Sequence, residues 1–216
     1  MRVAGVSVAL ALCGAAAGGI YKWIDDGGRT HYGDVPPAAG ANRLRGLADA
    51  EAVDLRWYPV TGTDAKAMWR AIGANGPRRD DGKVFAARTD WNLGYRYQTR
   101  VLDGQCRVTD VTTRLAVVMR LPRWDDEADA PPDLRQRWQR YLEALRLHEN
   151  GHRDNGVAAT GEVQAKLGAL PPRPDCGGFD AEARNVASEI IARYVERDRE
   201  YDRVTEHGRT QGARFP

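Results

Sequence analysis

The sequence has little net charge, little cysteine and almost no lysine. Its 32 basic residues are nearly balanced by 30 acidic ones, and the formal charge of +2 is too small for a protein that neutralises nucleic-acid phosphates. Only four of the basic residues are lysine, and 28 are arginine. Hydrophobic residues make up 42% of the chain, which is enough for a buried core and argues against intrinsic disorder. We therefore expect a globular protein with no nucleic-acid partner.

No stretch of the chain contains the roughly 20 consecutive apolar residues that a membrane-spanning helix requires. The N-terminus instead has the pattern of a secretory signal, with Arg2, an uncharged run over Val3–Leu12, and small residues at Ala15–Ala17. This pattern predicts a signal peptide over residues 1–19. The mature protein is then periplasmic or secreted, with no stable membrane span after cleavage. An uncleaved N-terminal anchor is one alternative. Lipid modification of Cys13 is another, and it is disfavoured because the bulky Leu12 precedes the cysteine.

Cysteine is rare, with three residues in the whole chain. Removal of the signal peptide leaves Cys106 and Cys176, an even pair in an oxidising compartment. A disulfide between them is the simplest interpretation. The alternative, that both cysteines are zinc ligands, is disfavoured because neither lies in a CxxC-type pair.

The first part of the mature chain predicts a small β-hairpin module over residues 20–37. Two short alternating segments, Tyr21–Ile24 and Thr30–Tyr32, flank an Asp-Asp-Gly-Gly turn. The aromatic-Lys-Trp strand, the Asp-x-Gly turn and the Asp-x-Pro-Pro exit make this segment similar to domain of unknown function 4124. That resemblance implies residence in the cell envelope. Residues 38–51, rich in Ala and Gly, follow as a predicted linker.

Residues 52–216 are predicted to form the main domain, in which strands precede helices. Alternating residues before and after Asp103-Gly104 indicate a long antiparallel hairpin. A proline-free segment from Asp133 to Leu170 has apolar residues at steps of three and four, which predicts one long helix. The other predicted elements are a strand over 52–60, a helix over 63–72 with Thr63 or Asp64 as N-cap and Gly73 as its end, and a C-terminal helix capped by Asp180. The expected fold class is α+β, with an antiparallel sheet packed on the long helix and a C-terminal helix.

A His-Glu-Asn-Gly-His motif, which has the form HExxH, lies in the middle of the long predicted helix. At about 3.6 residues per turn, His148 and His152 lie one turn apart on the same face and can bind one ion together. Glu149 projects about a hundred degrees away, which suits a carboxylate that contacts an activated water rather than the metal. The pattern therefore predicts Zn²⁺ as cofactor and Glu149 as general base. Two satisfied or exposed histidines on a helix face are the alternative.

A catalytic zinc site needs a third protein ligand. The only histidine after the motif is His207, directly after the C-terminal helix, and we expect it to reach the metal. A carboxylate of the same helix is the alternative, and the candidates are Glu196, Glu200 and Asp202. Gly151 inside the motif lowers helix propensity by roughly 1 kcal/mol, which suggests close approach of another backbone or of substrate.

Most of the mature chain resembles the bacterial family called domain of unknown function 922, described as zinc-dependent proteases. The carrying features are Tyr-Pro-Val-Thr-Gly at 58–62, Gly76-Pro77, Thr-Asp-Trp at 89–91, the Cys106 strand, Leu-Pro-Arg-Trp at 121–124, the HExxH helix, Asp175-Cys176, and the terminal Tyr201-Asp202-x-x-Thr205-x-His207-Gly208 with Gln-Gly-Ala at 211–213. The resemblance implies a zincin-like fold and supports His207 as a ligand. It also places Tyr201 at the site, where its hydroxyl can donate to an oxyanion. A core tyrosine is the alternative.

Together these observations predict a zinc-dependent peptidase that hydrolyses peptide bonds of a protein or peptide substrate in the cell envelope. One alternative is a non-catalytic envelope interaction protein with a structural or degenerate zinc site. Another is a zinc amidase that acts on peptidoglycan. The sequence does not indicate the oligomeric state.

Overall fold

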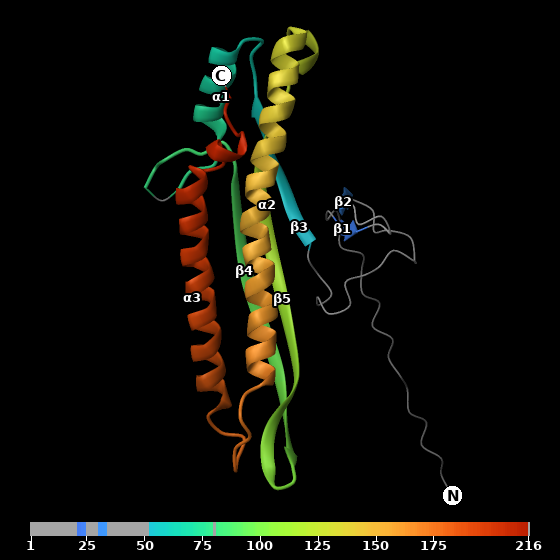
Figure 1. The fold of residues 1–216 in the computed structure, drawn as a ribbon, viewed down its shortest axis with the longest axis vertical. Helices are drawn as coiled ribbons and strands as arrows, with labels where there is room; N and C mark the ends of the chain where they lie inside the picture. Colours follow the sequence, from blue (N-terminus) through green and yellow to red (C-terminus); the bar gives the residue numbers. More distant parts are fainter. Residues whose placement is uncertain (1–20, 25–29, 34–51, 80, 216) are drawn as a thin grey trace, which may run out of the picture.

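The computed structural model describes residues 21–24, 30–33, 52–79 and 81–215 (Figure 1). Strands β1 (Tyr21–Ile24) and β2 (Thr30–Gly33) pair antiparallel, as expected for the hairpin module. The predicted signal peptide over residues 1–19 and the predicted linker over 38–51 lie outside the described residues. Those two assignments remain predictions.

The main domain contains a three-stranded sheet in the order β3-β5-β4, formed by β3 (Ala52–Val60), β4 (Arg88–Leu102) and β5 (Gln105–Trp124). The hairpin of β4 and β5 turns at Asp103 and Gly104, which both have positive φ, as the sequence predicted. The prediction of an antiparallel sheet was wrong in one respect, because β3 pairs with β5 in parallel. Helix α1 (Ala65–Asn75) separates β3 from β4, so β3 joins the sheet at the far edge rather than as a hairpin partner.

Two long helices cover the sheet. Helix α2 (Pro132–Gly168) has 37 residues, or about 55 Å at 1.5 Å per residue, and packs on β4 and β5. Helix α3 (Phe179–Thr205) packs beside α2, so the main domain is elongated (Figure 1). The helices begin and end within a few residues of the predicted limits. The differences are that α1 continues through Gly73 to Asn75, and that Gly178 rather than Asp180 is the N-cap of α3.

The hydrophobic core is divided into two clusters along α2. One cluster packs residues of the first third of the helix, such as Leu134 and Trp138, against α1 and the sheet. The other packs Val163 and Leu167, near the end of the helix, against α3. The helix between them buries polar residues instead, namely His148, Glu149, His152 and Arg153. A buried polar layer of this kind requires internal partners, and the candidate site supplies them for the two histidines.

Cys106 and Cys176 form a disulfide with an S–S distance of 2.00 Å, which confirms the predicted pair. It joins the start of β5 to the connection between α2 and α3, where Cys106 also exchanges backbone hydrogen bonds with Arg173. A disulfide is typical of an extracytoplasmic compartment. None of the described helices has the length and apolar character needed to cross a membrane.

Candidate metal centre

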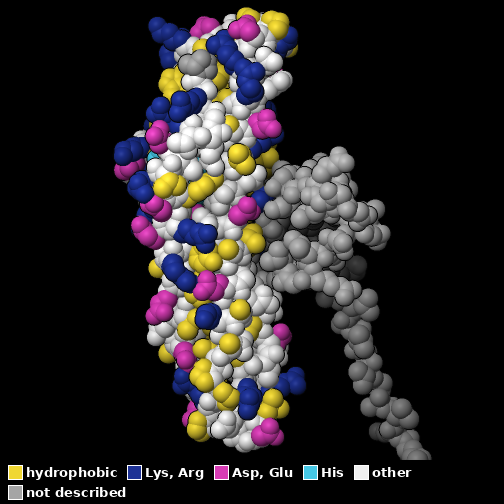
Figure 2. Space-filling model, in the orientation of Figure 1, with side chains coloured by type: hydrophobic (Ala, Val, Ile, Leu, Met, Phe, Trp, Pro, Cys, Tyr) yellow, Lys and Arg dark blue, Asp and Glu magenta, His cyan; other side chains and the backbone are white. Residues whose placement is uncertain are grey.

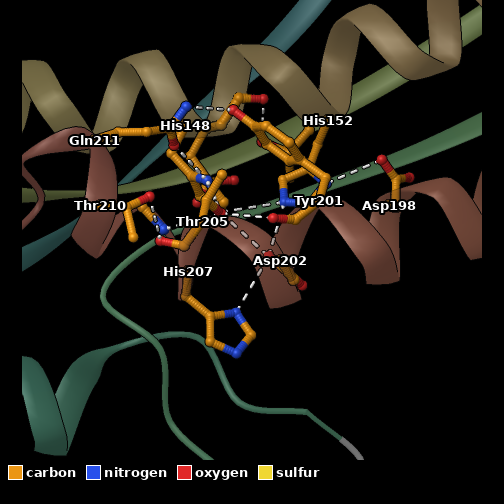
Figure 3. A network of polar contacts seen from close by, with 12 residues as sticks. His148, His152, Asp198, Tyr201, Asp202, Thr205, His207, Thr210 and Gln211 are labelled. Atoms are coloured by element: carbon orange, nitrogen blue, oxygen red, sulfur yellow. Dashed lines mark hydrogen bonds and ion pairs between the residues drawn. The ribbon is translucent and has the colours of Figure 1, made fainter.

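Three side chains from the two long helices converge on one point (Figure 3). His148 and His152 lie one turn apart on α2, and Asp202 faces them from α3. Oδ1 of Asp202 lies 3.2 Å from Nε2 of His148 and 3.1 Å from Nε2 of His152, and the two Nε2 atoms are 3.3 Å apart. One ligand atom from each residue lies within 4.8 Å of the others, so the group can hold one metal ion. The convergence of both imidazoles agrees with the predicted spacing.

The outer contacts of the two histidines determine which ring nitrogen carries the proton. Nδ1 of His148 lies 3.0 Å from Oε1 of Gln211, and Nδ1 of His152 lies 3.0 Å from Oδ1 of Asp198. Both partners are acceptors, so Nδ1 is the donor, and in the neutral, metal-binding form of each ring Nε2 presents a lone pair. These two lone pairs and a carboxylate oxygen of Asp202 face the same small space. Three acceptors in contact are stabilised only by a positive charge between them.

The pKa values of His152 and Asp202 also indicate that a positive charge is stabilised between these groups. Burial on its own lowers the pKa of His152, but hydrogen bonds to Asp198 and Asp202 outweigh it and raise the pKa to about 10. For Asp202, burial raises the pKa, but hydrogen bonds to His148 and His152 hold it well below its ordinary value. The cluster therefore attracts either a proton or a metal ion, and the two compete for the same lone pairs.

Asp198 holds His152 in its orientation. One oxygen of its carboxylate accepts from His152 and from Nδ2 of Asn155 at 2.6 Å, and the other accepts from Nε1 of Trp91 at 2.7 Å. A carboxylate behind a metal-binding histidine fixes the ring tautomer and increases the basicity of the ligand nitrogen. Asp198 and Asp202 lie four residues apart on α3, which mirrors the spacing of the two histidines on α2.

His148 is held by the C-terminal segment. Gln211 accepts from His148 Nδ1 and donates from Nε2 to the hydroxyl of Tyr201 at 2.9 Å. The ring of Tyr201 stacks on His148 with the centroids 4.9 Å apart and an angle of 9° between the planes. Thr205 Oγ1 also lies 3.3 Å from Nδ1 of His148 while its hydroxyl donates to the carbonyl of Tyr201. Tyr201 therefore lies at the site, where the sequence placed it.

Gly151 is required by this packing. A Cβ atom at residue 151 would lie 2.4 Å from the hydroxyl oxygen of Tyr201. The close neighbour is thus an aromatic side chain of α3, rather than the backbone or substrate that the sequence suggested. Only glycine lets the two helices approach closely enough for Tyr201 to stack on His148.

Glu149 is buried beside the centre. It is 3% exposed, and its Oε2 has no hydrogen-bond partner among the described residues. Burial raises its pKa, although a hydrogen bond with Thr89 and the charges of His152 and His148 oppose the change. A buried carboxyl oxygen without a partner is costly, and such groups are found where a water or a reacting group binds. Glu149 is therefore suited to exchange a proton near the metal position.

His207 does not join the three converging groups. Its Nδ1 lies 3.1 Å from Oδ1 of Asp202, its ring packs edge-on against Phe85, and its side chain is 49% exposed. Asp202, one of the carboxylates that the sequence left open, takes the position expected for His207. The other two candidates are exposed, and each pairs with an arginine of its own helix: Glu196 with Arg199 and Glu200 with Arg203.

Sequence reasoning missed Asp198, and it did not predict that Thr205 and Gln211 contact His148. A signal for Asp198 and Asp202 was present, because the buried stripe of α3 continues through them. Its members are Ala183, Ala187, Ile190 and Tyr194. Continued at steps of three and four, this stripe reaches 198, 201 or 202, and 205. Helix periodicity does not reach Gln211, which lies in the short C-terminal segment after the helix; the family resemblance includes Gln211 and Thr205 but assigns them no role.

Residues 55–208 match the family described as "Bacterial protein of unknown function (DUF922)", and the chain belongs to that family. Residues 7–51 match a second family, "Domain of unknown function (DUF4124)". Searches of curated proteins and of solved structures found no significant match. The zincin-like character of the fold therefore remains a prediction.

Proposed function

We propose that this protein is a zinc-dependent hydrolase that cleaves peptide bonds in the cell envelope. The observation that carries the proposal is the convergence of two imidazole lone pairs and the Asp202 carboxylate on one point. Two nitrogen donors and one oxygen donor form a set that suits zinc. Three protein ligands also leave a fourth position open, as hydrolysis requires.

The residues around the centre fit the chemistry of amide hydrolysis. A zinc ion bound by the three ligands would activate a water and polarise the substrate carbonyl. Glu149, buried with a raised pKa, would accept the proton of the attacking water and return it to the leaving amine. The hydroxyl of Tyr201 accepts a hydrogen bond from Gln211, so its own proton is available to an oxyanion. Asp198 and Gln211 would keep the two histidines oriented.

A structural zinc site is the second candidate. The proximity of His207 to Asp202 favours it, because a rotation of this half-exposed imidazole could supply a fourth ligand. A closed site with four protein ligands would have no position for water. The metal centre would then connect α2 and α3 without catalysing a reaction.

Metal content and turnover distinguish the two candidates. We expect the purified mature protein to contain one zinc ion, as measured by elemental analysis, and Asp202→Ala to contain none. Glu196→Gln, an exposed carboxylate change on the same helix, serves as the control and should retain zinc. Glu149→Gln should keep zinc while hydrolysis of a peptide library falls at least about a hundredfold. Stoichiometric zinc without any hydrolysis in the wild type would support the structural role.

A further inference from the structure

A surface groove lies beside the metal centre, between the first half of α2 and the C-terminal segment. Its volume is about 630 Å³, within the range of about 300–1,000 Å³ that is usual for ligand pockets. Helix α2 contributes Arg137, Arg140 and Leu147, and the C-terminal segment contributes Gln211 and Arg214. Figure 2 shows that Lys and Arg side chains gather near the end of the molecule that carries α1 and the start of α2.

The lining of the groove is positively charged. Three arginines face only one acidic residue, Glu143, so the lining has a net charge of +2. Arg137 is paired with Asp133 at 2.9 Å. Within the described part of the chain, Arg140 and Arg214 form no ion pair, and Arg214 donates only from Nε to a backbone carbonyl. Two guanidinium groups are therefore available to a ligand, and their planar donors match a carboxylate.

The groove also has an apolar side. Leu147 is 57% exposed, although it lies next to the ligand His148 on the helix. Together with Ala144 and Tyr141 it lines the groove. A mixture of guanidinium groups and apolar surface suits a peptide better than a phosphate polymer, which presents charge without apolar side chains. The small net charge of the whole chain also argues against a phosphate polymer as the ligand.

The groove is continuous with the metal centre through one residue. Gln211 lines the groove and also accepts the hydrogen bond from Nδ1 of the metal ligand His148. Arg137, Arg140 and Ala144 follow the same face of α2 that ends at His148, at steps of three and four residues. A peptide in the groove would thus lie directly behind the first ligand of the centre.

We propose that this groove binds an acidic segment of the protein substrate and so selects substrates for the hydrolase. The inference rests on the proposed function, which it extends with a substrate class. Carboxylates of the bound segment would pair with Arg140 and Arg214, and its apolar side chains would contact Leu147.

Binding of charged peptides to the mature protein tests the proposal. Fluorescence anisotropy is measured with fluorescein-labelled hexaglutamate and, for comparison, labelled hexalysine. We expect hexaglutamate to bind, hexalysine not to bind, and Arg140→Glu to weaken hexaglutamate binding about tenfold, because the change replaces an attraction with a repulsion. Arg140→Gln should give a smaller loss in the same direction. Equal affinity of both peptides, or an Arg140→Glu variant that binds like the wild type, would overturn the proposal.

Arg184→Glu is the matched control. Arg184 is also exposed on a helix, and it does not line the groove. If it weakens binding as much as Arg140→Glu does, the effect reflects net charge and the groove assignment is wrong. Tighter binding of inorganic polyphosphate than of hexaglutamate would assign the groove to a phosphate polymer and overturn the peptide assignment.

The experiments can refute the groove proposal and the hydrolase proposal independently of each other. Asp202→Ala should lose zinc and hydrolysis yet bind hexaglutamate like the wild type, because Asp202 does not line the groove. A wild type that binds the peptide through Arg140 but holds no zinc would refute the hydrolase alone. A wild type that holds zinc and hydrolyses peptides without preferring acidic ones would refute the groove alone.

Discussion

Replacement of Asp198 by asparagine should weaken zinc binding although Asp198 does not contact the metal position. Its carboxylate accepts from three donors: Nδ1 of His152 at 3.0 Å, Nδ2 of Asn155 at 2.6 Å and Nε1 of Trp91 at 2.7 Å. Asparagine has the same shape but only one acceptor oxygen, so its amide NH₂ must face at least one of these donors. The orientation and basicity of His152 are then no longer enforced.

The expected loss of zinc affinity can be taken from other metal sites in which a hydrogen-bond partner of a histidine ligand has been removed. Removal of a partner behind a metal-binding histidine costs about 10- to 100-fold in affinity, which corresponds to about 1.4–2.8 kcal/mol. We expect Asp198→Asn to fall in this range. Competition for zinc with a chromophoric chelator measures the affinity, and a thermal melt establishes that the variant is folded.

Glu196→Gln provides the comparison for this measurement. Glu196 lies on the same helix, is exposed, and contacts Arg199 rather than the centre. It should bind zinc as the wild type does. An Asp198→Asn variant that is folded and binds zinc within about twofold of the wild type would refute the assignment of Asp198 as the group that positions His152.

Four further variants test other parts of the structure. Gly151→Ala should lower the melting temperature and the zinc affinity, because the new Cβ displaces Tyr201, whereas Gly161→Ala, with open space around it, should raise stability by about 0.5–1 kcal/mol. Cys106→Ser should lower the melting temperature by about 10 °C, because the disulfide closes a loop with a sequence separation of 70 and contributes about 4 kcal/mol. His207→Ala should leave the zinc content unchanged if the centre has three ligands, and a loss of zinc in elemental analysis would identify His207 as a ligand.

Features that depend on local sequence were predictable. The Asp103-Gly104 turn predicts its hairpin because both residues tolerate positive φ. The spacing of His148 and His152 predicts their convergence because an α-helix places residues four apart on one face. Both features follow from backbone geometry over a few residues, so no distant contact was needed to infer them.

Features that depend on distant pairing were not predictable in the same way. The alternation in residues 52–60 indicates a strand, but it does not say which strand lies beside it, and the parallel pairing with β5 was missed. The choice among carboxylates of α3 depends on how the helix is rotated about its axis. Glu196 and Asp198 differ by about 200° around the helix, so only one of them can face α2. The buried residues Ala183, Ala187, Ile190 and Tyr194 indicate this rotation, because their spacing continued along the helix reaches Asp198 and Asp202.

The division of the core explains why the centre lies where it does. Two apolar clusters along α2 hold the helix against the sheet and against α3, and both leave the middle of the helix to polar residues. Burial of His148, Glu149 and His152 between them is costly unless their charges and hydrogen bonds are satisfied. The partners of the two histidines come from α3 and the C-terminal segment, so the site depends on the packing of these elements against α2. A cation in the centre would therefore stabilise the packing of α2 on α3 as well as serve the chemistry.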